Sequence, residues 1–247
     1  PFYASGSGAP VILFVGDSHA EQYYPAVQHA SESLEPAPSV MFSTKGGCPF
    51  LPDLDVRYCG DVYRRSLALA KSASVRRVVI ASVWSGYVDE HFGRDSGGQT
   101  ILTAKSSRKA TVHDVEESFR TLAADIATLR SQGKDIVIIA SHPGSMSADP
   151  ARMVAPLRVR FRAASVAAFA SSFSAVDSKR GAAWMDGQLA RVAQSTGATL
   201  IHPTDFLCPH DSCMTMDEHG APLRIDAGHL RPFAVTRYMT FVPALLR

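Results

Sequence analysis

The sequence predicts a three-layer α/β/α sandwich built on a mostly parallel, roughly five-stranded sheet, and two observations carry this prediction. First, β-rich apolar runs alternate with segments of helical spacing along the whole chain. Second, three of the apolar runs are continuous rather than alternating, which is typical of strands buried on both faces of a parallel sheet. The five expected strands cover residues 10–16, 39–43, 77–83, 135–141 and 198–202.

Five further segments are expected to be helices: residues 20–34, 61–74, 112–132, 180–196 and 230–246. The third is the clearest, because its apolar residues recur every three or four positions: Val112, Val115, Phe119, Leu122, Ile126 and Leu129. Gly133 follows, where a glycine commonly ends a helix. In the last segment, Pro232 and Pro243 confine the helix to the stretch between them.

The composition is that of an ordinary globular protein. Of the 247 residues, 46% are hydrophobic and 19% are charged, which excludes a disordered chain, a coiled coil and collagen. No stretch approaches the roughly 18 consecutive apolar residues of a membrane-spanning helix. The 25 Lys and Arg residues against 23 Asp and Glu residues give a formal charge of +2, too balanced to predict a nucleic-acid partner.

A single domain spanning residues 1–247 is expected, with residues 1–9 as a linker or N-terminal extension. The sequence contains no internal repeat and no second core that would place a domain boundary. It opens on Pro1-Phe2-Tyr3, without an initiator Met or the profile of a signal peptide, so it reads as a fragment or a processed product.

Two long polar segments interrupt the alternation, at residues 89–110 and 141–162. Both are expected to be loops at the rim of the sheet, where functional residues are often found. The second contains four arginines that either bind an anionic substrate or form a solvated face: Arg152, Arg158, Arg160 and Arg162.

The four cysteines fall into two local pairs in loop sequence, Cys48 with Cys59 and Cys208 with Cys213. An even number of cysteines at short range predicts two disulfides, and therefore an oxidising compartment outside the cytoplasm. Free thiols are one alternative. Another is a zinc site with four potential ligands: Cys208, His210, Cys213 and His219. The spacing of these residues is not that of a zinc knuckle. We expect the disulfides, and no metal.

The first expected strand ends in Gly16-Asp17-Ser18-His19, directly before a helix. Ligands of an open parallel sheet bind outside the carboxyl ends of its strands, so Ser18 stands where chemistry is expected. A helix N-terminus also offers backbone N–H groups that can hold a developing oxyanion. Gly16 permits a tight turn and Asp17 can brace it. The plainer alternative is that Asp17 or Ser18 only caps the helix.

A second motif, Asp226-Ala227-Gly228-His229, precedes the last expected helix. Its Asp and His are close enough for the carboxylate to accept a hydrogen bond from one imidazole nitrogen, which leaves the other to take a proton from a serine. The alternative is an ordinary surface loop, since the chain has nine histidines. The position before the last helix favours a catalytic interpretation, because in this architecture the loop can fold back over the end of the first strand.

Together these motifs resemble the SGNH (GDSL-type) hydrolase superfamily. More narrowly, the chain resembles the SGNH domain fused to the membrane-embedded acyltransferase-3 domain of bacterial polysaccharide O-acyltransferases. The resemblance covers roughly residues 11–238 and implies an SGNH, flavodoxin-like fold. Four features carry it: Gly16-Asp17-Ser18-His19-Ala20, Gly47-Cys48-Pro49, Trp84, and the Cys208 and Cys213 pair before Asp226-x-x-His229.

The resemblance implies a role for each matching residue. Ser18 is the nucleophile, His229 is the general base and then the general acid, and Asp226 orients the imidazole. The oxyanion hole is formed by the backbone N–H group of Ser18 and by one from the glycine turn, Gly46-Gly47. Within this turn Gly47 is preferred over Gly46.

One departure concerns the third oxyanion donor, which is an Asn side chain in the superfamily. The chain contains no Asn, and the matching segment contains Trp84 and Ser85. Either a backbone N–H, the Trp84 indole or the Ser85 hydroxyl replaces it, or the hole has one donor fewer, at a cost of about 10²–10³ in rate. Trp84 is alternatively a core residue.

Substrate contacts are expected from Asp17, His19, Ser85 and His142, although both histidines can equally be packed or bonded within the protein.

The sequence therefore predicts an enzyme, an SGNH-type O-acyltransferase or esterase that needs no cofactor. The resemblance implies transfer of an acyl group, expected to be acetyl, to a cell-surface carbohydrate in the periplasm or another extracytoplasmic space. A membrane-embedded acyltransferase-3 domain, fused upstream, would deliver the acyl donor. A stand-alone carbohydrate O-acetylesterase and a catalytically silent glycan-binding domain are the alternatives, the second because the Asn is absent.

Overall fold

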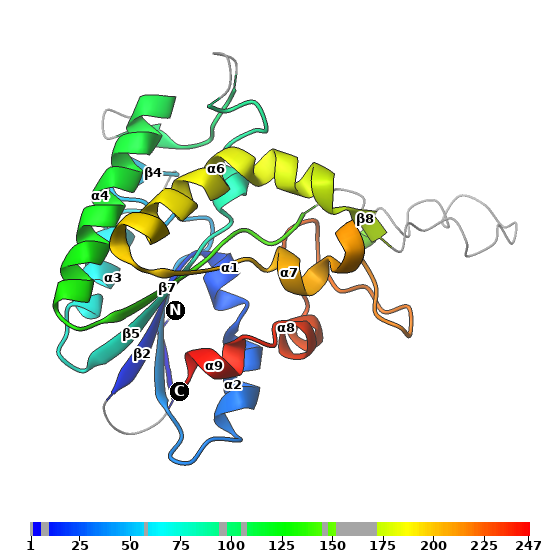
Figure 1. Ribbon diagram of the computed structural model, residues 1–247, viewed down its shortest axis with the longest axis horizontal. Helices are drawn as coiled ribbons and strands as arrows, with labels where there is room; N and C mark the ends of the chain where they lie inside the picture. The colour runs from blue at the N-terminus through cyan, green and yellow to red at the C-terminus, as the bar shows by residue number, and fades with distance from the viewer. Residues whose placement is uncertain are drawn as a thin grey trace, which may run out of the picture.

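The central feature of the chain is a sheet between two layers of helices (Figure 1), which confirms the expected α/β/α sandwich. The computed structural model describes residues 2–5, 10–56, 59–93, 98–104, 108–144, 148–151 and 172–247. Of residues 2–5, only the backbone is described.

Five parallel strands form the sheet in the order β3-β2-β5-β7-β9. Their bounds lie within two residues of the expected ones: β2 (Val11–Gly16), β3 (Ser39–Thr44), β5 (Val75–Ala81), β7 (Asp135–Ile139) and β9 (Thr199–Ile201). Residues 12–15 of β2 are fully buried, as a continuous apolar run predicts for a strand covered on both faces. Along the chain, β3 is added on one side of β2 and β5 on the other, so the direction of strand addition reverses between β2 and β5. Open parallel sheets bind ligands outside the carboxyl ends of the two strands at such a reversal.

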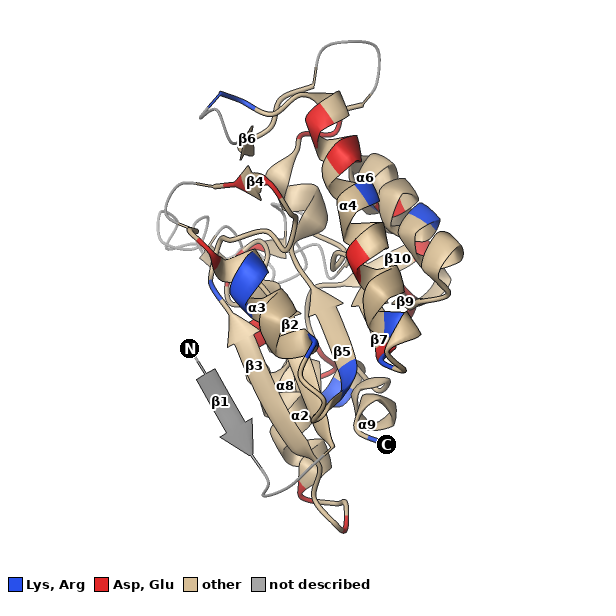
Figure 2. Ribbon diagram, turned by 90° about the vertical axis from the view of Figure 1, so that its left-hand side faces the viewer, with Lys and Arg blue, Asp and Glu red and all other residues tan. Residues whose placement is uncertain are grey.

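Charged residues avoid the interior of this sheet. In Figure 2 they lie on the helices, the loops and the starts of β5 and β7. At those starts, the Arg77 guanidinium donates to the Asp135 carboxylate at 2.6 Å and joins the two strands. The carboxyl ends of the strands are left to the loops that follow them.

Residues 2–5 are a strand rather than part of a linker. β1 (Phe2–Ser5) pairs antiparallel with β3 at the edge of the sheet, which therefore has six strands. A four-residue edge strand bounded by Gly and Ser carries too little sequence pattern to be predicted.

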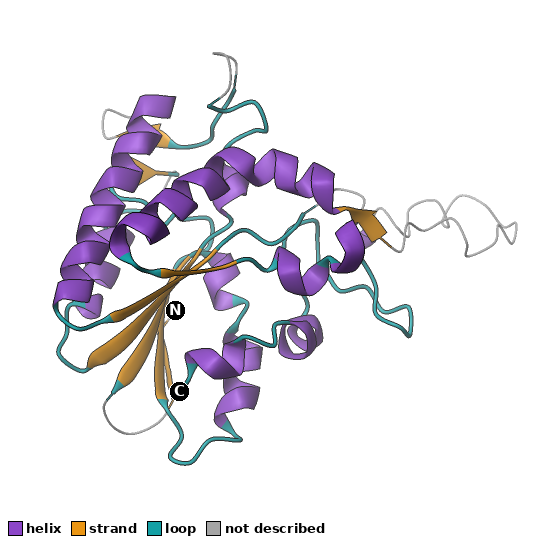
Figure 3. Ribbon diagram, in the orientation of Figure 1, coloured by secondary structure: helices purple, strands orange, loops and turns teal. Residues whose placement is uncertain are grey.

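One face of the sheet is covered by α3 (Val62–Ala70), α4 (Val112–Ser131) and α6 (Ala175–Thr196). Figure 3 shows these helices on one side of the strands. The apolar stripe predicted for α4 is buried except for the partly buried Val112, and a capping box of Thr111 and Asp114 begins the helix. The helix α6 begins five residues earlier than expected, because the Ser174 side chain caps it.

Four short helices cover the other face: α1 (Ser18–Glu21), α2 (Tyr24–Ser31), α8 (Pro232–Tyr238) and α9 (Val242–Leu245). The single helix expected over residues 20–34 is wrong, because Pro25 lies in the first turn of a new helix, α2. Only α8 lies between the two prolines of the last segment. Pro243 lies in the first turn of the additional helix α9.

The expected loop at residues 89–110 contains the two-residue strand β6 (Thr103–Ala104), which pairs with β4 (Leu54–Asp55). Other short elements in the described residues are η1 (Trp84–Tyr87), β8 (Ser172–Ser174), α7 (Thr204–Leu207), η5 (Pro209–Asp211) and β10 (Ser212–Met214). Most of the second expected loop lies outside the described residues, including its four arginines: Arg152, Arg158, Arg160 and Arg162.

Both expected disulfides are present, Cys48–Cys59 and Cys208–Cys213. The free-thiol and zinc alternatives are therefore wrong for these cysteines, because sulfurs bonded to each other supply no thiolate ligands. In the described part of the chain, no helix has the length and apolar character needed to span a membrane.

Candidate active site

The turn after β2, which we call the Ser18 turn (residues 16–19), is shaped by Gly16. Its φ of +142° lies in the region that favours glycine. A Cβ at this position would lie 1.7 Å from the carbonyl oxygen of Ala81, the last residue of β5. Only glycine therefore allows the turn to pack against the end of β5.

Asp17 is a buried structural carboxylate and not the substrate-binding residue expected from the sequence. Its Oδ1 accepts the His19 N–H at 2.7 Å, and its Oδ2 accepts the Val83 N–H at 2.9 Å and the Tyr87 hydroxyl at 2.6 Å. Burial raises the pKa of the Asp17 carboxyl, although these hydrogen bonds oppose the shift. With no exposed surface, Asp17 caps α1 and joins the Ser18 turn to η1.

The Ser18 hydroxyl meets the His229 imidazole across 211 positions of sequence. Ser18 Oγ lies 2.7 Å from His229 Nε2, and His229 Nδ1 lies 2.9 Å from Oδ2 of Asp226. Because a carboxylate only accepts hydrogen bonds, Nδ1 carries the proton and the Nε2 lone pair faces the hydroxyl. In this arrangement the imidazole is placed to take the Ser18 proton.

Asp226 also shapes its own segment, the His229 loop (residues 226–230). Its Oδ1 accepts the N–H groups of Gly228 and His229, each at 2.8 Å. Burial disfavours the charged carboxylate, but these hydrogen bonds and the nearby imidazole outweigh it and lower the pKa of Asp226. The side chains of Asp226 and His229 are 53% and 34% exposed, so this half of the site faces solvent.

The glycine turn after β3 lies beside the Ser18 turn. The Lys45 N–H donates to the Gly16 carbonyl at 3.1 Å, which attaches the glycine turn to the end of β2. Gly47 has a φ of +69°, where glycine is favoured, and both Gly46 and Gly47 are exposed. The assignment of the Ser18, Gly46 and Gly47 N–H groups to an oxyanion hole stays a prediction.

The Trp84 indole is not an oxyanion donor. Its N–H donates to the Ile139 carbonyl at 2.8 Å, and the fully buried ring packs near Phe119. Trp84 is therefore a core residue, the alternative that the sequence left open. The Ser85 N–H is also engaged, with Ser141 Oγ at 3.0 Å, so the Ser85 hydroxyl is the remaining side-chain candidate in this segment.

His19 and His142 form a buried pair next to His229. Their Nδ1 atoms are 3.3 Å apart, and the His19 and His229 ring centroids are 4.9 Å apart. Burial lowers the pKa of both residues, to about 3 for His19, so both are neutral at neutral pH. Both nitrogens of His142 have protein partners, Gln22 Nε2 at 3.1 Å and the Tyr23 hydroxyl at 2.9 Å. Both ring nitrogens of His142 are therefore engaged within the protein, and its expected substrate contact stays a prediction.

The chain as a whole matches the family model described as "SGNH domain (fused to AT3 domains)", over residues 1–241. The chain belongs to this family. Its membership confirms the resemblance seen in the sequence and makes the chain an SGNH-type enzyme. No curated protein gives a significant match.

The chain is similar to two solved structures. The periplasmic domain of a lipopolysaccharide acetyltransferase from Salmonella ser. Paratyphi A is similar with a TM-score of 0.66 and 15% identity, covering 98% of this chain and 85% of that chain. A catalytic mutant of the acetylxylan esterase Axe2 from Geobacillus stearothermophilus gives a TM-score of 0.48 and 12% identity, covering 98% of each chain. At 15% identity, the first of these likenesses shows a shared fold.

A cleft of about 580 Å³ opens beside the buried histidines of the SGNH domain. Its walls come from the segment after β5, the first turns of α6 and the His229 loop, and it is lined by His19, Ser85 and His142 among others. Small residues make up much of the lining: Gly86, Gly144, Gly181, Ala182, Ala227 and Gly228. The volume is within the range of small-molecule sites.

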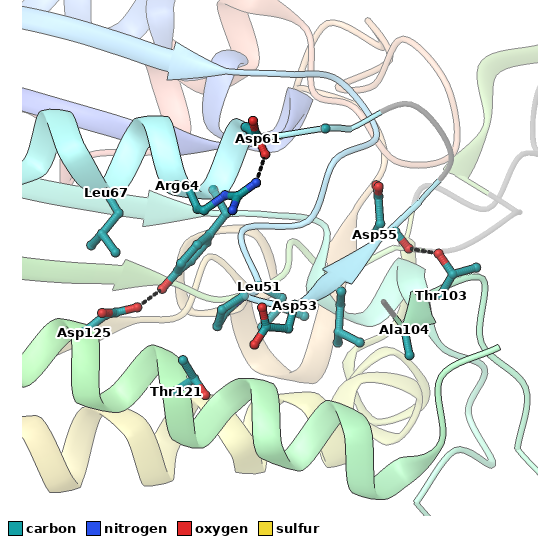
Figure 4. Close-up of a pocket in the computed structure, with 14 residues that line it drawn as sticks. Leu51, Asp53, Asp55, Asp61, Arg64, Leu67, Thr103, Ala104, Thr121 and Asp125 are labelled. Carbon is teal, nitrogen blue, oxygen red and sulfur yellow. Dashed lines mark hydrogen bonds and ion pairs between the residues drawn. The ribbon is translucent and has the colours of Figure 1, made fainter. Parts of the chain in front are cut away.

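Another hollow, of about 500 Å³, lies between β4, α3 and α4 (Figure 4). Its lining includes four aspartates: Asp53, Asp55, Asp61 and Asp125. The Tyr63 hydroxyl donates to Asp125 at 2.7 Å, and Arg64 pairs with Asp61. None of the residues predicted for the active site lines this hollow, so it is separate from the Ser18 and His229 pair.

Three residues of the site were missed from the sequence: Gln22, Tyr23 and Tyr87. Tyr87 bonds Asp17, and the other two bond His142. Each of these contacts joins residues 70 or more positions apart. Such contacts leave no local periodicity or motif, so a single sequence offers no signal for them.

Proposed function

We propose that this SGNH domain transfers a short acyl group, in the first place acetyl, to a hydroxyl of a cell-surface carbohydrate through an acyl-Ser18 intermediate. The observation that carries the proposal is the 2.7 Å contact between Ser18 Oγ and His229 Nε2, with Asp226 on the other imidazole nitrogen. A hydroxyl, an imidazole and a carboxylate in this order form the recurring machinery of acyl transfer.

In the acylation half-reaction, His229 Nε2 takes the Ser18 proton as Oγ attacks the carbonyl carbon of the acyl donor. The N–H groups of Ser18 and Gly47 stabilise the negative oxygen of the tetrahedral intermediate. When this intermediate collapses, the bond to the donor's leaving oxygen or sulfur breaks, and His229 returns the proton to that atom. The products are acyl-Ser18 and the free leaving group.

In the second half-reaction, His229 takes the proton of a sugar hydroxyl as its oxygen attacks the acyl-Ser18 carbonyl. Collapse of this intermediate forms the sugar ester, and the proton returns to Ser18. The same steps with water as the acceptor would release the free acid, which is the esterase reaction. The cleft beside His19 and Ser85 is the space in which an acceptor sugar would compete with water.

Three further observations support the proposed compartment, acyl donor and acceptor. The two disulfides are in keeping with an extracytoplasmic compartment, here the periplasm. The family description supports an acyltransferase-3 domain in the same protein, which would supply the acyl group from the membrane. The likeness to a lipopolysaccharide acetyltransferase domain is in keeping with a bacterial surface polysaccharide as the acceptor.

The decisive variant is Ser18→Ala. Turnover of p-nitrophenyl acetate is expected to fall by about 10⁴-fold or more, to the background rate, because the covalent step is lost. A fluorophosphonate probe should label the wild type at Ser18, as located by mass spectrometry of the digested protein.

The matched control is Ser33→Ala, a change at an exposed serine after α2, which should turn over and label like the wild type. Equal turnover by Ser18→Ala and the wild type, or a fluorophosphonate adduct on a different serine, would contradict the proposal. Transfer is then separated from hydrolysis by adding oligosaccharide acceptors and detecting their acetylated forms by mass spectrometry.

A further inference from the structure

The segment that links the two halves of the site is the end of α1. Gln22 follows Ser18 by four residues and is the C-cap of that helix. Its Oε1 accepts the N–H of Leu230 at 2.9 Å, across 208 positions of sequence. Leu230 is the residue directly after His229, so this hydrogen bond joins the helix of the nucleophile to the loop of the base.

Most other hydrogen bonds of the His229 loop are internal to its own region. Asp226 accepts the N–H groups of Gly228 and His229, and the Ile225 N–H donates to the His229 carbonyl at 2.9 Å. These bonds give the loop its shape but do not position it relative to Ser18. Among the described residues, the loop is hydrogen-bonded to α1 and its C-cap through two contacts, that of Leu230 with Gln22 and that of His229 with Ser18.

The orientation of the Gln22 amide follows from its partners. A backbone N–H only donates, so the atom that faces Leu230 is the amide oxygen, and the NH₂ group points the other way. There it donates to the His19 carbonyl at 3.1 Å and to His142 Nδ1 at 3.1 Å. All three contacts agree on one orientation, which leaves the Gln22 side chain no freedom to turn.

This amide also fixes the state of the buried histidines. Because His142 Nδ1 accepts from Gln22, the proton of the neutral ring is on Nε2, where it donates to the Tyr23 oxygen at 2.9 Å. The Nδ1 atom of His19 lies 3.3 Å from this nitrogen, whose single lone pair already accepts from Gln22. Neutral rings agree with the effect of burial, which lowers the pKa of both histidines. The support under the Ser18 turn is therefore a bonded network centred on Gln22.

We propose that Gln22 is a positioning residue, which holds the His229 loop against α1 so that His229 Nε2 stays within hydrogen-bond reach of Ser18 Oγ. This role rests on the proposed function of the Ser18 and His229 pair. Displacement of a catalytic group by about 1 Å costs about 10²-fold in rate, so loss of the tether acts on turnover. It has little effect on substrate affinity, because Gln22 does not line the cleft.

The test uses two variants of Gln22 in the 247-residue chain, with p-nitrophenyl acetate as the substrate. Gln22→Met keeps the side-chain length but removes the acceptor for Leu230, and kcat should fall by about 10- to 100-fold with KM within about twofold. Gln22→Glu restores an acceptor for the Leu230 N–H, and its kcat should lie above that of Gln22→Met. Gln28→Met, at an exposed glutamine of α2, is the matched control and should behave like the wild type.

A spectroscopic measurement separates positioning from stability. The downfield proton resonance of His229 Nδ1–H, which the Asp226 carboxylate shifts, should change in Gln22→Met and not in Gln28→Met. Wild-type kcat in Gln22→Met overturns the proposal. So does an equal loss of kcat in Gln22→Met and Gln22→Glu with an unchanged His229 resonance, because that result reports destabilisation alone. Ser18→Ala distinguishes failure of the proposed function from failure of the positioning role. If Ser18→Ala keeps turnover, the proposed function fails. If Ser18→Ala abolishes turnover and Gln22→Met does not reduce it, only the positioning role of Gln22 fails.

Discussion

The two halves of the candidate site are built in opposite ways. The Ser18 turn is buried: Gly16 packs against the last residue of β5, and the enclosed Asp17 carboxylate accepts three hydrogen bonds, one from the turn itself and two from η1 and its N-cap. The His229 loop faces solvent, and its shape depends on Asp226, a residue within the loop itself. One half is part of the core, and the other is attached to it.

This difference separates what each half contributes. Buried groups in close contact with backbone have no room to adjust, so a change at Gly16 or Asp17 should act first on the free energy of unfolding. Exposed side chains contribute little to stability, so a change in the His229 loop should act first on the reaction rate. Substitutions matched across the two halves test this separation.

The largest effect is expected from Gly16→Ala. Its methyl group would collide with the Ala81 carbonyl oxygen, and the φ of +142° is unfavourable for alanine, so the free energy of unfolding should fall by more than about 4 kcal/mol. Urea or thermal unfolding followed by circular dichroism measures the loss. Gly187→Ala, within α6, is the control and should raise stability by about 0.5–1 kcal/mol. A stable Gly16→Ala protein would show that the turn relaxes without cost.

A large effect on rate alone is expected from Asp226→Asn. The amide can donate to Nδ1 and so favours the tautomer with its proton on Nε2, which cannot accept the Ser18 proton. Turnover of p-nitrophenyl acetate should fall by about 10²–10⁴-fold, with the free energy of unfolding within about 1 kcal/mol of the wild type.

The control for this change is Asp217→Asn. Asp217 Oδ1 accepts the N–H groups of His219 and Ala221 in another loop, so the variant repeats the structural change away from Ser18. It should keep wild-type turnover. If both variants lose activity equally, the effect of Asp226 is structural and the difference between the two halves disappears.

The most gradual effect is a pH dependence of stability on the buried side, which is small at each pH step. Burial lowers the pKa of His19 to about 3, so between that value and the unfolded value of about 6.5 the unfolded chain binds a proton that the folded protein does not. Stability should therefore fall as the pH drops from about 6.5 toward 3, by about 1.4 kcal/mol per pH unit for this histidine.

Urea unfolding of His19→Gln over the same pH range measures this contribution. The slope of stability against pH should decrease by about one proton relative to the wild type. His29→Gln, at an exposed histidine of α2, is the control and should keep the wild-type slope. Identical slopes for all three proteins would mean that His19 is protonated in the folded state.

Much of this architecture could be predicted because its signals are local. The run of residues 12–15 identified a strand buried on both faces, and the short spacing of Cys208 and Cys213 identified a disulfide. The division of the first expected helix into α1 and α2 was missed. The helical spacing of apolar residues continues through Pro25, although the helix itself is interrupted before this residue. β1 was missed because a four-residue edge strand carries too little sequence pattern.

The candidate site was predicted unevenly for the same reason. The motifs around Ser18 and His229 are recognisable as short patterns, and the structure brings the two side chains together. No short sequence pattern tells whether a hydrogen-bond donor or acceptor is available to a substrate. Trp84, Asp17 and His142 all have groups that can bind a substrate, and in the structure those groups already bind the protein.

Hydrophobic period and residue type are encoded position by position, so the layers of the fold, the pairs of cysteines and the two places where chemistry was expected could be predicted from the sequence. Which polar groups are engaged within the protein, and how the base is held beside the nucleophile, became known from the folded chain. A hydrogen bond such as that between Gln22 and Leu230 depends on where two distant backbones meet, and that position is set by the packing of the whole chain.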